Sequence, residues 1–203
     1  MDNRKDLDIR NSIIETGRLL YSKGLIAGRD GNISVRTGKS TMLTTCSGIH
    51  KGFMKVEDLV ELDFSGLGFP EPVKSRGCKP STEALLHAEI YRKSREAGAI
   101  IHAHAPYSTA LGLRIRSGEM VDMTSLAEGR LLFGKVPVVP EFPPGSEELA
   151  TATASYFPAN SAVILKAHGA VAAGRDIMDA LSVMEALEHN ARILAIAASI
   201  GRV

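Results

Sequence analysis

Residues 99–104, Ala-Ile-Ile-His-Ala-His, are the stretch that decides the fold. Gly98 precedes a run of apolar and partly β-branched residues, which is typical of a buried strand. Alternate residues of a strand point to the same face, so His102 and His104 are expected side by side. Two neighbouring imidazoles can bind one divalent metal ion, and the question is which other ligands converge on them.

Outward from this strand, helices and strands are interspersed along the chain. The pattern predicts helices over 6–23, 80–97, 107–113, 145–156 and from 176 onward, and strands over 33–36, 41–45, 60–64, 136–139, 161–167 and 170–174. At least two strand pairs have connections too short for a parallel crossover. We therefore expect an α/β fold with three αβα layers, in which helices cover both faces of a mixed, largely antiparallel central sheet. No repeat or long linker interrupts the pattern, which predicts a single domain over residues 1–203.

Composition narrows the possible function classes. The 203 residues are 44% apolar and 23% charged, an ordinary balance for a globular protein. A formal net charge of +1 gives no electrostatic case for binding nucleic acid or an anionic membrane. The charged start does not resemble a signal peptide and no apolar run approaches a membrane span, so we expect a cytoplasmic protein. Cys46 and Cys78 lack a metal-binding spacing and are expected as reduced, structural thiols.

A third histidine completes a candidate metal centre. His168 ends an apolar strand, as His104 does, and Gly169 follows it in a turn. If the two strand ends lie side by side, three imidazoles meet at one point. Three nitrogen ligands with open positions are typical of a catalytic divalent site, most often zinc. One histidine alone is more often a packed core or rim residue, but the His-x-His pair with a third strand-end histidine favours a metal site.

Glu83 follows Pro80, Ser81 and Thr82 at the start of a predicted helix, just before the histidine strand. A carboxylate beside a metal can ligate it or act as a base. The alternative is that Glu83 only complements the positive end of the helix dipole. Ser81, Thr82 and the helix N-terminus suit an anion such as phosphate, although N-capping alone also explains the two hydroxyls.

Two further polar loops suit the same anion. Asn32 follows Gly31 in a turn, and Ser47 and Gly48 lie in a short loop. Each pair alone is typical of an ordinary turn. Together with the hydroxyls at the helix start, they offer the hydroxyl, amide and backbone N–H donors that hold phosphate without a strongly basic pocket. His87 shares a helix face with the glutamate, and packing against the sheet is its expected role.

Five short motifs occur in order along the chain. They are Gly31-Asn32-Ile33-Ser34, Cys46-Ser47-Gly48, Lys79-Pro80-Ser81-Thr82-Glu83, His102-Ala103-His104 and Ala167-His168-Gly169. No single motif is specific, but the set is. Over about residues 10–194 the chain resembles the class II aldolase/adducin family, whose enzymes include L-fuculose-1-phosphate aldolase and L-ribulose-5-phosphate 4-epimerase.

The resemblance implies a role for each motif. In family aldolases the residues that match His102, His104 and His168 bind zinc. The residue that matches Glu83 ligates the metal in the resting enzyme and acts as acid and base. The implied phosphate pocket consists of Asn32, Ser47, Gly48, Ser81 and Thr82. Manganese or cobalt also suits imidazole and carboxylate ligands, and the resemblance implies a homotetramer with active sites between neighbouring subunits.

The implied function is a metal-dependent aldehyde-lyase of carbohydrate metabolism. It would cleave a small ketose 1-phosphate to dihydroxyacetone phosphate and an aldehyde, with Glu83 moving protons and the metal stabilising negative charge. The same site could serve a sugar-phosphate epimerase or a methylthioribulose-1-phosphate dehydratase, although Glu83 favours the aldolase. A further alternative is a non-enzymatic interaction module like the head domain of adducin, which keeps the fold without the metal ligands.

One departure from the family pattern concerns the second acid. In the fuculose-phosphate enzyme, a tyrosine of the neighbouring subunit donates a proton to the aldehyde oxygen. The matching position here is Met123, and no tyrosine occurs between Tyr107 and Tyr156. Glu128 is the nearest acidic candidate for this role, and a solvated loop carboxylate is the alternative.

Overall fold

The computed structural model describes residues 3–74 and 77–200. Its strands are β1 (Asn32–Arg36), β2 (Thr41–Thr45), β3 (Leu59–Asp63), β4 (Glu71–Pro72), β5 (Ala99–Ala103), β6 (Met120–Asp122), β7 (Lys135–Val139), β8 (Ala162–Leu165) and β9 (Gly169–Gly174). They form one sheet in the order β4-β3-β2-β1-β5-β9-β8-β7-β6. Neighbouring strands are antiparallel except β7 and β8, which are parallel. The mixed, largely antiparallel sheet expected from the sequence is confirmed.

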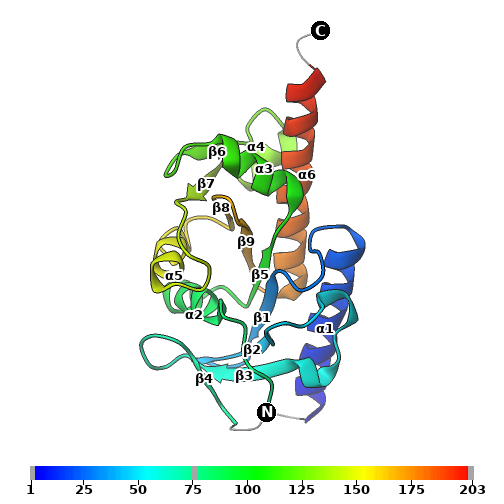
Figure 1. Cartoon of the computed structure of the whole chain (residues 1–203), viewed down its shortest axis with the longest axis vertical. Helices are drawn as coiled ribbons and strands as arrows, with labels where there is room; N and C mark the ends of the chain where they lie inside the picture. Colours follow the sequence, from blue (N-terminus) through cyan, green and yellow to red (C-terminus); the bar gives the residue numbers. More distant parts are fainter. Residues whose placement is uncertain (1–2, 75–76, 201–203) are drawn as a thin grey trace.

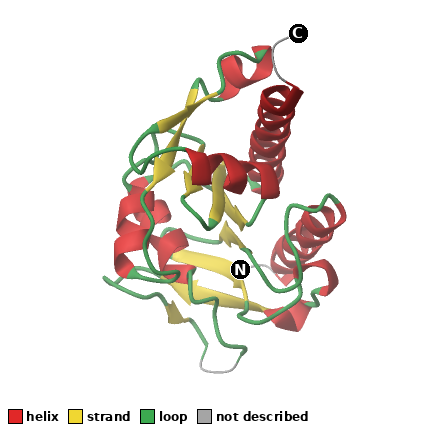
Figure 2. Ribbon diagram, turned by 45° about the horizontal axis from the view of Figure 1, so that its top comes forward, coloured by secondary structure: helices red, strands yellow, loops and turns green. Residues whose placement is uncertain are grey.

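Helices cover both faces of this sheet (Figures 1 and 2). They are α1 (Asn3–Ser22), α2 (Ala84–Lys93), α3 (Pro106–Arg114), α4 (Ala127–Leu132), α5 (Glu147–Ala154) and α6 (Ile177–Ile200), with the short 3-10 helices η1 (Lys51–Phe53) and η2 (Val56–Asp58). In Figure 1, α1 and α6 lie on one side of the sheet, and α2 and α5 lie on the other. The three layers predicted from the sequence are therefore confirmed.

Each face of the sheet has an apolar core, which lies between the sheet and the helices that cover it. Ile101 of β5 shares one core with Ile13 of α1 and Leu187 of α6. Its neighbour Ile100 points to the opposite face and shares the other core with Leu149 of α5. All five side chains are buried. Because β5 is covered on both faces, it has no position for an exposed polar residue, which explains the wholly apolar run before the histidines.

β5 occupies the centre of the sheet, between β1 and β9. Asn32 of β1 pairs with His102 on one side, and Val171 of β9 pairs with the same histidine on the other. The strand ends at Ala103, so His104 lies one residue beyond it. The start of β1, the end of β5 and the start of β9 consequently meet at one edge of the sheet.

α2 starts later than the sequence predicts. Its first helical residue is Ala84 and its N-cap is Glu83, which makes no side-chain capping bond. The Ser81 hydroxyl instead accepts a hydrogen bond from the Glu83 backbone N–H at 3.3 Å, in the turn before the helix. N-capping of the helix by Ser81 or Thr82 is therefore wrong, and the Glu83 side chain turns toward the end of β5.

Cys46 and Cys78 form a disulfide, with their Cα atoms 5.9 Å apart. The expectation of two reduced thiols is therefore wrong, because the fold brings two distant segments together. Cys46 also forms an isolated antiparallel bridge with Pro80. Beside it, the Ser47 N–H donates to the Lys79 carbonyl at 2.9 Å. The disulfide thus joins the two loops that are expected to bind phosphate.

α6 spans 24 residues, and its last turns extend past the rest of the molecule (Figure 1). Its first half packs on the sheet through residues such as Leu187. Near its end, Ile196 and Ile200 are 42% and 66% exposed. None of the helices within 3–74 and 77–200 combines the length and apolar character that crossing a membrane requires.

Candidate active site

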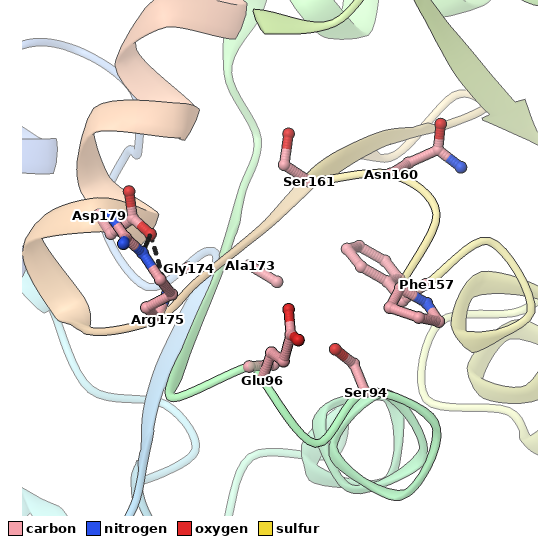
Figure 3. A pocket seen from close by; sticks show the side chains of 11 residues that line it. Ser94, Glu96, Phe157, Asn160, Ser161, Ala173, Gly174, Arg175 and Asp179 are labelled. Carbon is pink, nitrogen blue, oxygen red and sulfur yellow. Dashed lines mark hydrogen bonds and ion pairs between the residues drawn. The ribbon is translucent and has the colours of Figure 1, made fainter.

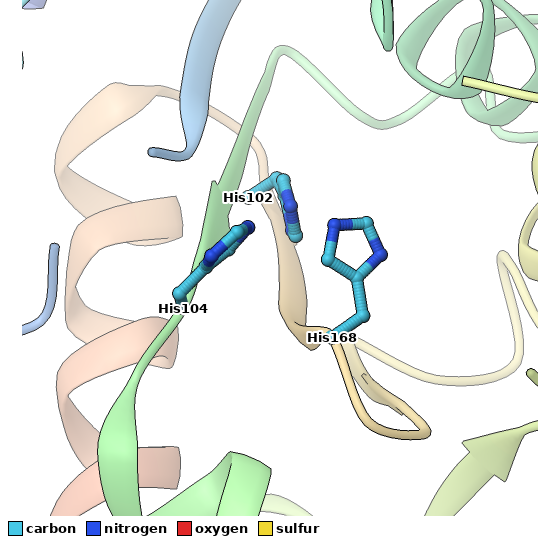
Figure 4. Close-up of side chains that lie close together, drawn as sticks. All are labelled: His102, His104 and His168. Atoms are coloured by element: carbon cyan, nitrogen blue, oxygen red, sulfur yellow. The ribbon is translucent and has the colours of Figure 1, made fainter. Parts of the chain in front are cut away.

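Three imidazoles meet at this edge of the sheet (Figure 4). His102 comes from β5, His104 from the residue after it, and His168 from the turn between β8 and β9. Their ring centroids are 5.0, 4.8 and 4.9 Å apart. One ligand atom from each histidine lies within 4.8 Å of the others. The structure thus brings together the three histidines that the sequence predicts as metal ligands.

Two glycines let the chain approach His102 closely. Gly31 has a φ of +66°, and a Cβ there would lie 2.6 Å from the His102 carbonyl oxygen. At Gly169, a Cβ would lie 2.5 Å from the Ala103 carbonyl oxygen and 3.1 Å from Cε1 of the His102 ring. A larger residue at either position would force the neighbouring segments apart. The Gly-Asn and His-Gly pairs are therefore required by the site as well as by the turns.

The turn between β8 and β9 sets the direction of His168. Leu165 pairs with Gly169 across it, and the His168 N–H donates to the Leu165 carbonyl at 3.2 Å. Ala167 has a φ of +57°, in the left-handed region. Alanine adopts this conformation at a cost of about 1 kcal/mol. The strained residue lies directly before His168 and fixes how its side chain leaves the turn.

The hydrogen bond of His102 decides which of its nitrogens can bind a metal. Its Nδ1 lies 3.0 Å from the carbonyl oxygen of Ala170. A carbonyl only accepts, so Nδ1 donates and Nε2 of the neutral ring keeps its lone pair. Nε2 is buried and faces the Glu83 carboxylate, whose Oε2 lies 3.2 Å away. Metal-ligating histidines have this arrangement, with one nitrogen held by an acceptor and the other directed at the metal.

The Glu83 carboxylate lies between two of the imidazoles. Its Oε2 is 3.2 Å from His102 Nε2, and its Oε1 is 3.3 Å from His168 Nε2. Asn32 Nδ2 donates a hydrogen bond to Oε2 at 2.9 Å and orients the carboxylate. In this position Glu83 can ligate a metal beside the histidines or, once released, exchange protons with a substrate.

The charges within this cluster are strongly coupled. Burial alone would raise the pKa of Glu83, but the neighbouring imidazoles and the Asn32 amide together hold it well below its ordinary value. Burial and the charge of His102 lower the pKa of His168 to about 4. The same two causes lower the pKa of His104. Burial would lower the pKa of His102, but Glu83 and the Ala170 carbonyl together raise it above its ordinary value. At neutral pH Glu83 is therefore ionised while His104 and His168 are neutral, and a metal at His102 Nε2 would have to displace the proton that Glu83 favours there.

This set of donors fits a divalent metal. Three imidazoles leave open coordination positions, as in catalytic zinc sites. The buried Nε2 of His102, which faces Glu83, can bind either a proton or a metal. Glu83 adds a negative charge beside the cation. Nitrogen and oxygen ligands of this kind also suit manganese and cobalt, so the donor set does not select one metal.

A cavity of about 250 Å³ opens beside the histidines. Its lining includes Asn32, Ser47, Gly48, Ser81, Thr82, Glu83, His104 and His168. All five residues predicted to bind phosphate thus share one cavity with Glu83, His104 and His168. Glu128 does not line it and is exposed on α4, and Met123 is completely buried. The structure of one chain therefore does not bring Glu128 to the cavity.

The sequence that forms this cavity is similar to that of known proteins. Residues 11–195 match the sequence profile described as Class II Aldolase and Adducin N-terminal domain. The chain belongs to the class II aldolase and adducin family. The match spans all residues of the cavity described above, which confirms the resemblance predicted from the motifs.

Relatives in the class II aldolase family carry several names. The chain is 33% identical over 195 residues to 3-oxo-tetronate 4-phosphate decarboxylase of Haemophilus influenzae, covering 93% of this chain and 87% of the relative. It is 34% identical over 184 residues to L-fuculose phosphate aldolase of Methanocaldococcus jannaschii, covering 91% and 94%. It is 34% identical over 186 residues to methylthioribulose-1-phosphate dehydratase of Methylococcus capsulatus, covering 87% and 88%. Identities this similar do not select one reaction.

A solved structure within the family confirms the fold. The crystal structure of L-fuculose-1-phosphate aldolase from Thermus thermophilus matches with a TM-score of 0.79 at 30% identity. The match covers 93% of both chains. The named relatives are enzymes, and the class II aldolase family is metal-dependent, in agreement with the histidine cluster.

Sequence reasoning missed three charged residues of this cavity: Arg29, which is exposed to solvent, and two less exposed residues, Asp30 and Lys51. Asp30 Oδ2 lies 3.8 Å from His104 Nδ1, and Lys51 is buried in the wall. Asp30 stands in a glycine-rich turn, where aspartate is ordinary. Lys51 follows a predicted loop, where a lysine is expected to be exposed. Neither residue has a local pattern that could have indicated its place.

His87, one turn after Glu83 in α2, belongs to a buried series of hydrogen-bonded side chains. His87 Nδ1 is 2.6 Å from Ser34 Oγ, which is 2.9 Å from the Tyr91 hydroxyl. Burial, with the charge of His102 acting in the same direction, lowers the pKa of His87 to about 3. His87 is therefore neutral, and the packing role predicted for it includes these hydrogen bonds.

A second cavity, of about 270 Å³, lies at the other end of β5 and differs from the histidine cavity in its lining residues (Figure 3). Glu96 and Ser94 precede β5, and Arg175 and Asp179 follow β9. The Arg175 N–H and Nε donate to Asp179 Oδ2 at 2.9 and 3.2 Å. Its lining contains neither histidine nor cysteine. The polar groups of this cavity therefore do not form a comparable metal site.

Proposed function

We propose that this chain is a metal-dependent lyase that cleaves a small ketose 1-phosphate to dihydroxyacetone phosphate and an aldehyde, as L-fuculose-1-phosphate aldolase does. The observation that carries the proposal is the Glu83 carboxylate between His102 and His168, in a cavity lined by phosphate-type donors. One cavity thus combines metal binding, proton transfer and anion binding.

The side chains have complementary roles in this proposal. A divalent metal held by the three histidines would polarise the substrate carbonyl as a Lewis acid. The hydroxyls of Ser47, Ser81 and Thr82 donate hydrogen bonds to the phosphate. The Asn32 amide, which already donates to Glu83, places the carboxylate next to the reacting carbons.

Cleavage requires two proton movements. The C4 hydroxyl loses its proton, the C3–C4 bond breaks, and the electron pair of that bond stays on C3 beside the carbonyl. Glu83 takes up a proton from solvent and delivers it to C3, which completes dihydroxyacetone phosphate and leaves Glu83 as the carboxylate. A second group accepts the proton of the C4 hydroxyl, and Glu128 of a neighbouring copy is the candidate. No oxidant or reductant is consumed.

The relative named 3-oxo-tetronate 4-phosphate decarboxylase supports a second candidate reaction. Decarboxylation of a 3-oxo acid also breaks a carbon–carbon bond at the carbon next to a carbonyl. The electron pair of the broken bond again stays on that carbon. The same metal and the same acid would therefore serve both reactions. A dehydratase or an epimerase remains an alternative, as does an adducin-like interaction module, although the complete set of histidines argues against the last.

The proposal also names the metal ion and the oligomeric state. Zinc is the proposed ion, because three imidazoles with an open position are its usual catalytic set. A homotetramer is proposed, with a neighbouring copy completing each active site in the cytoplasm. The apolar surface supports association: Leu131 is 84% exposed and Ile200 66% exposed. Exposed apolar residues of this size often mark contacts between subunits.

Product analysis tests the proposed function. The zinc-loaded protein is incubated with a panel of ketose 1-phosphates and with a 3-oxo acid phosphate, and the products are followed by NMR. Dihydroxyacetone phosphate with an aldehyde supports the lyase. Carbon dioxide, loss of water or a single isomerised product would instead identify the decarboxylase, the dehydratase or the epimerase. A protein that binds no metal, or that turns over equally well after chelation, would contradict all four.

A further inference from the structure

A buried cation lines the proposed phosphate subsite. Lys51 starts η1, shortly after Ser47 and Gly48, and is only 2% exposed. It belongs to the lining of the 250 Å³ cavity. Arg29 lines the same cavity but is exposed to solvent. Lysine is almost never fully buried unless its charge has a partner, so the position of Lys51 requires an explanation.

The ammonium group of Lys51 has one donor to spare. Nζ donates to the Ile49 carbonyl at 2.8 Å and to the Arg29 carbonyl at 3.2 Å. An ammonium group has three N–H donors, so one remains for a further acceptor. Across the described ranges, no carboxylate forms an ion pair with it, and Asp30 attracts it only from further away. The two carbonyls solvate the charge without neutralising it.

The backbone around Lys51 is held firmly. Its N–H donates to the Gly28 carbonyl at 3.3 Å. On its other side, a Cβ at Gly17 of α1 would lie 2.4 Å from the Lys51 carbonyl oxygen, so the helix and the loop are in close contact. The ammonium group is therefore fixed before any ligand arrives, which reduces the entropy lost on binding.

Charge balance in the cavity favours an anionic partner for Lys51. The hydroxyls of Ser47, Ser81 and Thr82 are neutral, so Lys51 is the buried positive charge that this lining offers to a phosphate. Burial, opposed by the Asp30 charge, lowers the pKa of Lys51 to about 8, so the amine is mostly cationic at neutral pH. A bound phosphate would offset the desolvation of the amine.

We propose that Lys51 is the cation of the phosphate subsite and donates its third N–H to the substrate phosphate. The inference rests on the proposed function in one respect, because it requires a phosphorylated substrate. A purely structural role, in which the amine only joins two loops through the Ile49 and Arg29 carbonyls, predicts a different result in the experiment below.

Calorimetric titration of inorganic phosphate into the metal-loaded protein tests the inference without turnover. Lys51→Gln keeps N–H donors for the two carbonyls and removes the charge, and Lys51→Met removes both. Lys39→Met is the matched control, because it removes one exposed positive charge outside the cavity. We expect both Lys51 variants to bind phosphate about 10- to 100-fold more weakly, with metal content unchanged, and the control to match the wild type.

The possible outcomes distinguish a failure of the Lys51 inference from a failure of the proposed reaction. Phosphate affinity within twofold of the wild type in Lys51→Gln would overturn the inference, as would a wild-type protein that does not bind phosphate. Loss of metal and of thermal stability in Lys51→Met, with phosphate affinity kept in Lys51→Gln, would show a loop tie instead. If phosphate binding depends on Lys51 but no ketose 1-phosphate is cleaved, the reaction is wrong and Lys51 remains an anion ligand.

Discussion

The centre of the sheet and the region of β6 and α4 differ in how firmly they are held. At the centre, His102 is completely buried, paired on both sides and enclosed by close glycine contacts. In the other region, Glu128 and Leu131 are exposed, and neither lines the cavity. One chain thus holds the proposed metal ligands and the proposed acid Glu83 in a fixed geometry, while the second acid of the proposed reaction has to come from elsewhere.

The largest expected effect follows from removing a ligand at the centre. His102→Ala removes a nitrogen that no other described side chain can replace, so we expect metal affinity to fall by more than about 100-fold and activity to disappear with it. His189→Ala, at an exposed position of α6, is the control. Metal content measured by mass spectrometry checks the prediction, and one bound metal per chain in His102→Ala would contradict it.

Glu83→Gln separates proton transfer from metal binding. The three histidines remain, so metal content should be kept, while kcat/KM falls by about 100- to 10,000-fold because the acid and base is lost. Glu96→Gln changes an exposed carboxylate at the far cavity and serves as the control. Steady-state kinetics on the substrate identified by NMR provides the measurement. Unimpaired turnover in Glu83→Gln would assign the proton transfer to another group.

Acid should destabilise the buried side of the site through His87. Its pKa is about 3 in the folded protein because it is buried, against about 6.5 in an unfolded chain. Below pH 6.5 the unfolded state therefore binds more protons, and the free energy of unfolding falls as the pH drops from 6.5 toward 4, by roughly 2–3 kcal/mol.

Urea unfolding of the metal-free protein at several pH values measures this slope. His87→Gln removes the contribution of His87 and should make the slope shallower, although the variant is less stable at pH 7. His189→Gln, on the exposed surface, should leave the slope as it is. Equal slopes for wild type and His87→Gln would assign the acid sensitivity to other groups, such as His168.

The smallest expected effect lies in the region of α4. Glu128 is exposed, so Glu128→Gln should change the free energy of unfolding by less than about 0.5 kcal/mol and leave metal content unchanged. If Glu128 serves the site of a neighbouring copy, we expect kcat to fall about 10-fold. Kinetics combined with light scattering tests this. A wild-type kcat would transfer the second-acid role to water or another residue.

The framework of the site could be predicted from the sequence because its signals are local. An apolar run with a His-x-His end indicates a strand and a shared face for His102 and His104. The hairpins around Ile33 and Val171 have connections short enough to fix antiparallel pairing. These patterns place His102 and His104 on one face and His168 at a strand end, whereas their meeting depends on the pairing of β5 with the distant β9.

Contacts between distant segments could not be predicted in this way. The Asn32 amide and the Glu83 carboxylate both read as turn or helix-start residues, and only the folded sheet shows that they bind each other. The pairing of Cys46 with Cys78 likewise depends on two loops that meet only in the fold. Short elements such as α4 have too few residues for a periodic signal.

The central position of β5 also has a consequence for the synthesis of the protein. A nascent chain that has emerged as far as His104 contains β1 and β5 but lacks β9 and His168. Domains fold as units while the ribosome adds residues from the N-terminal end. The three histidines of the proposed metal site can therefore meet only after translation has passed His168.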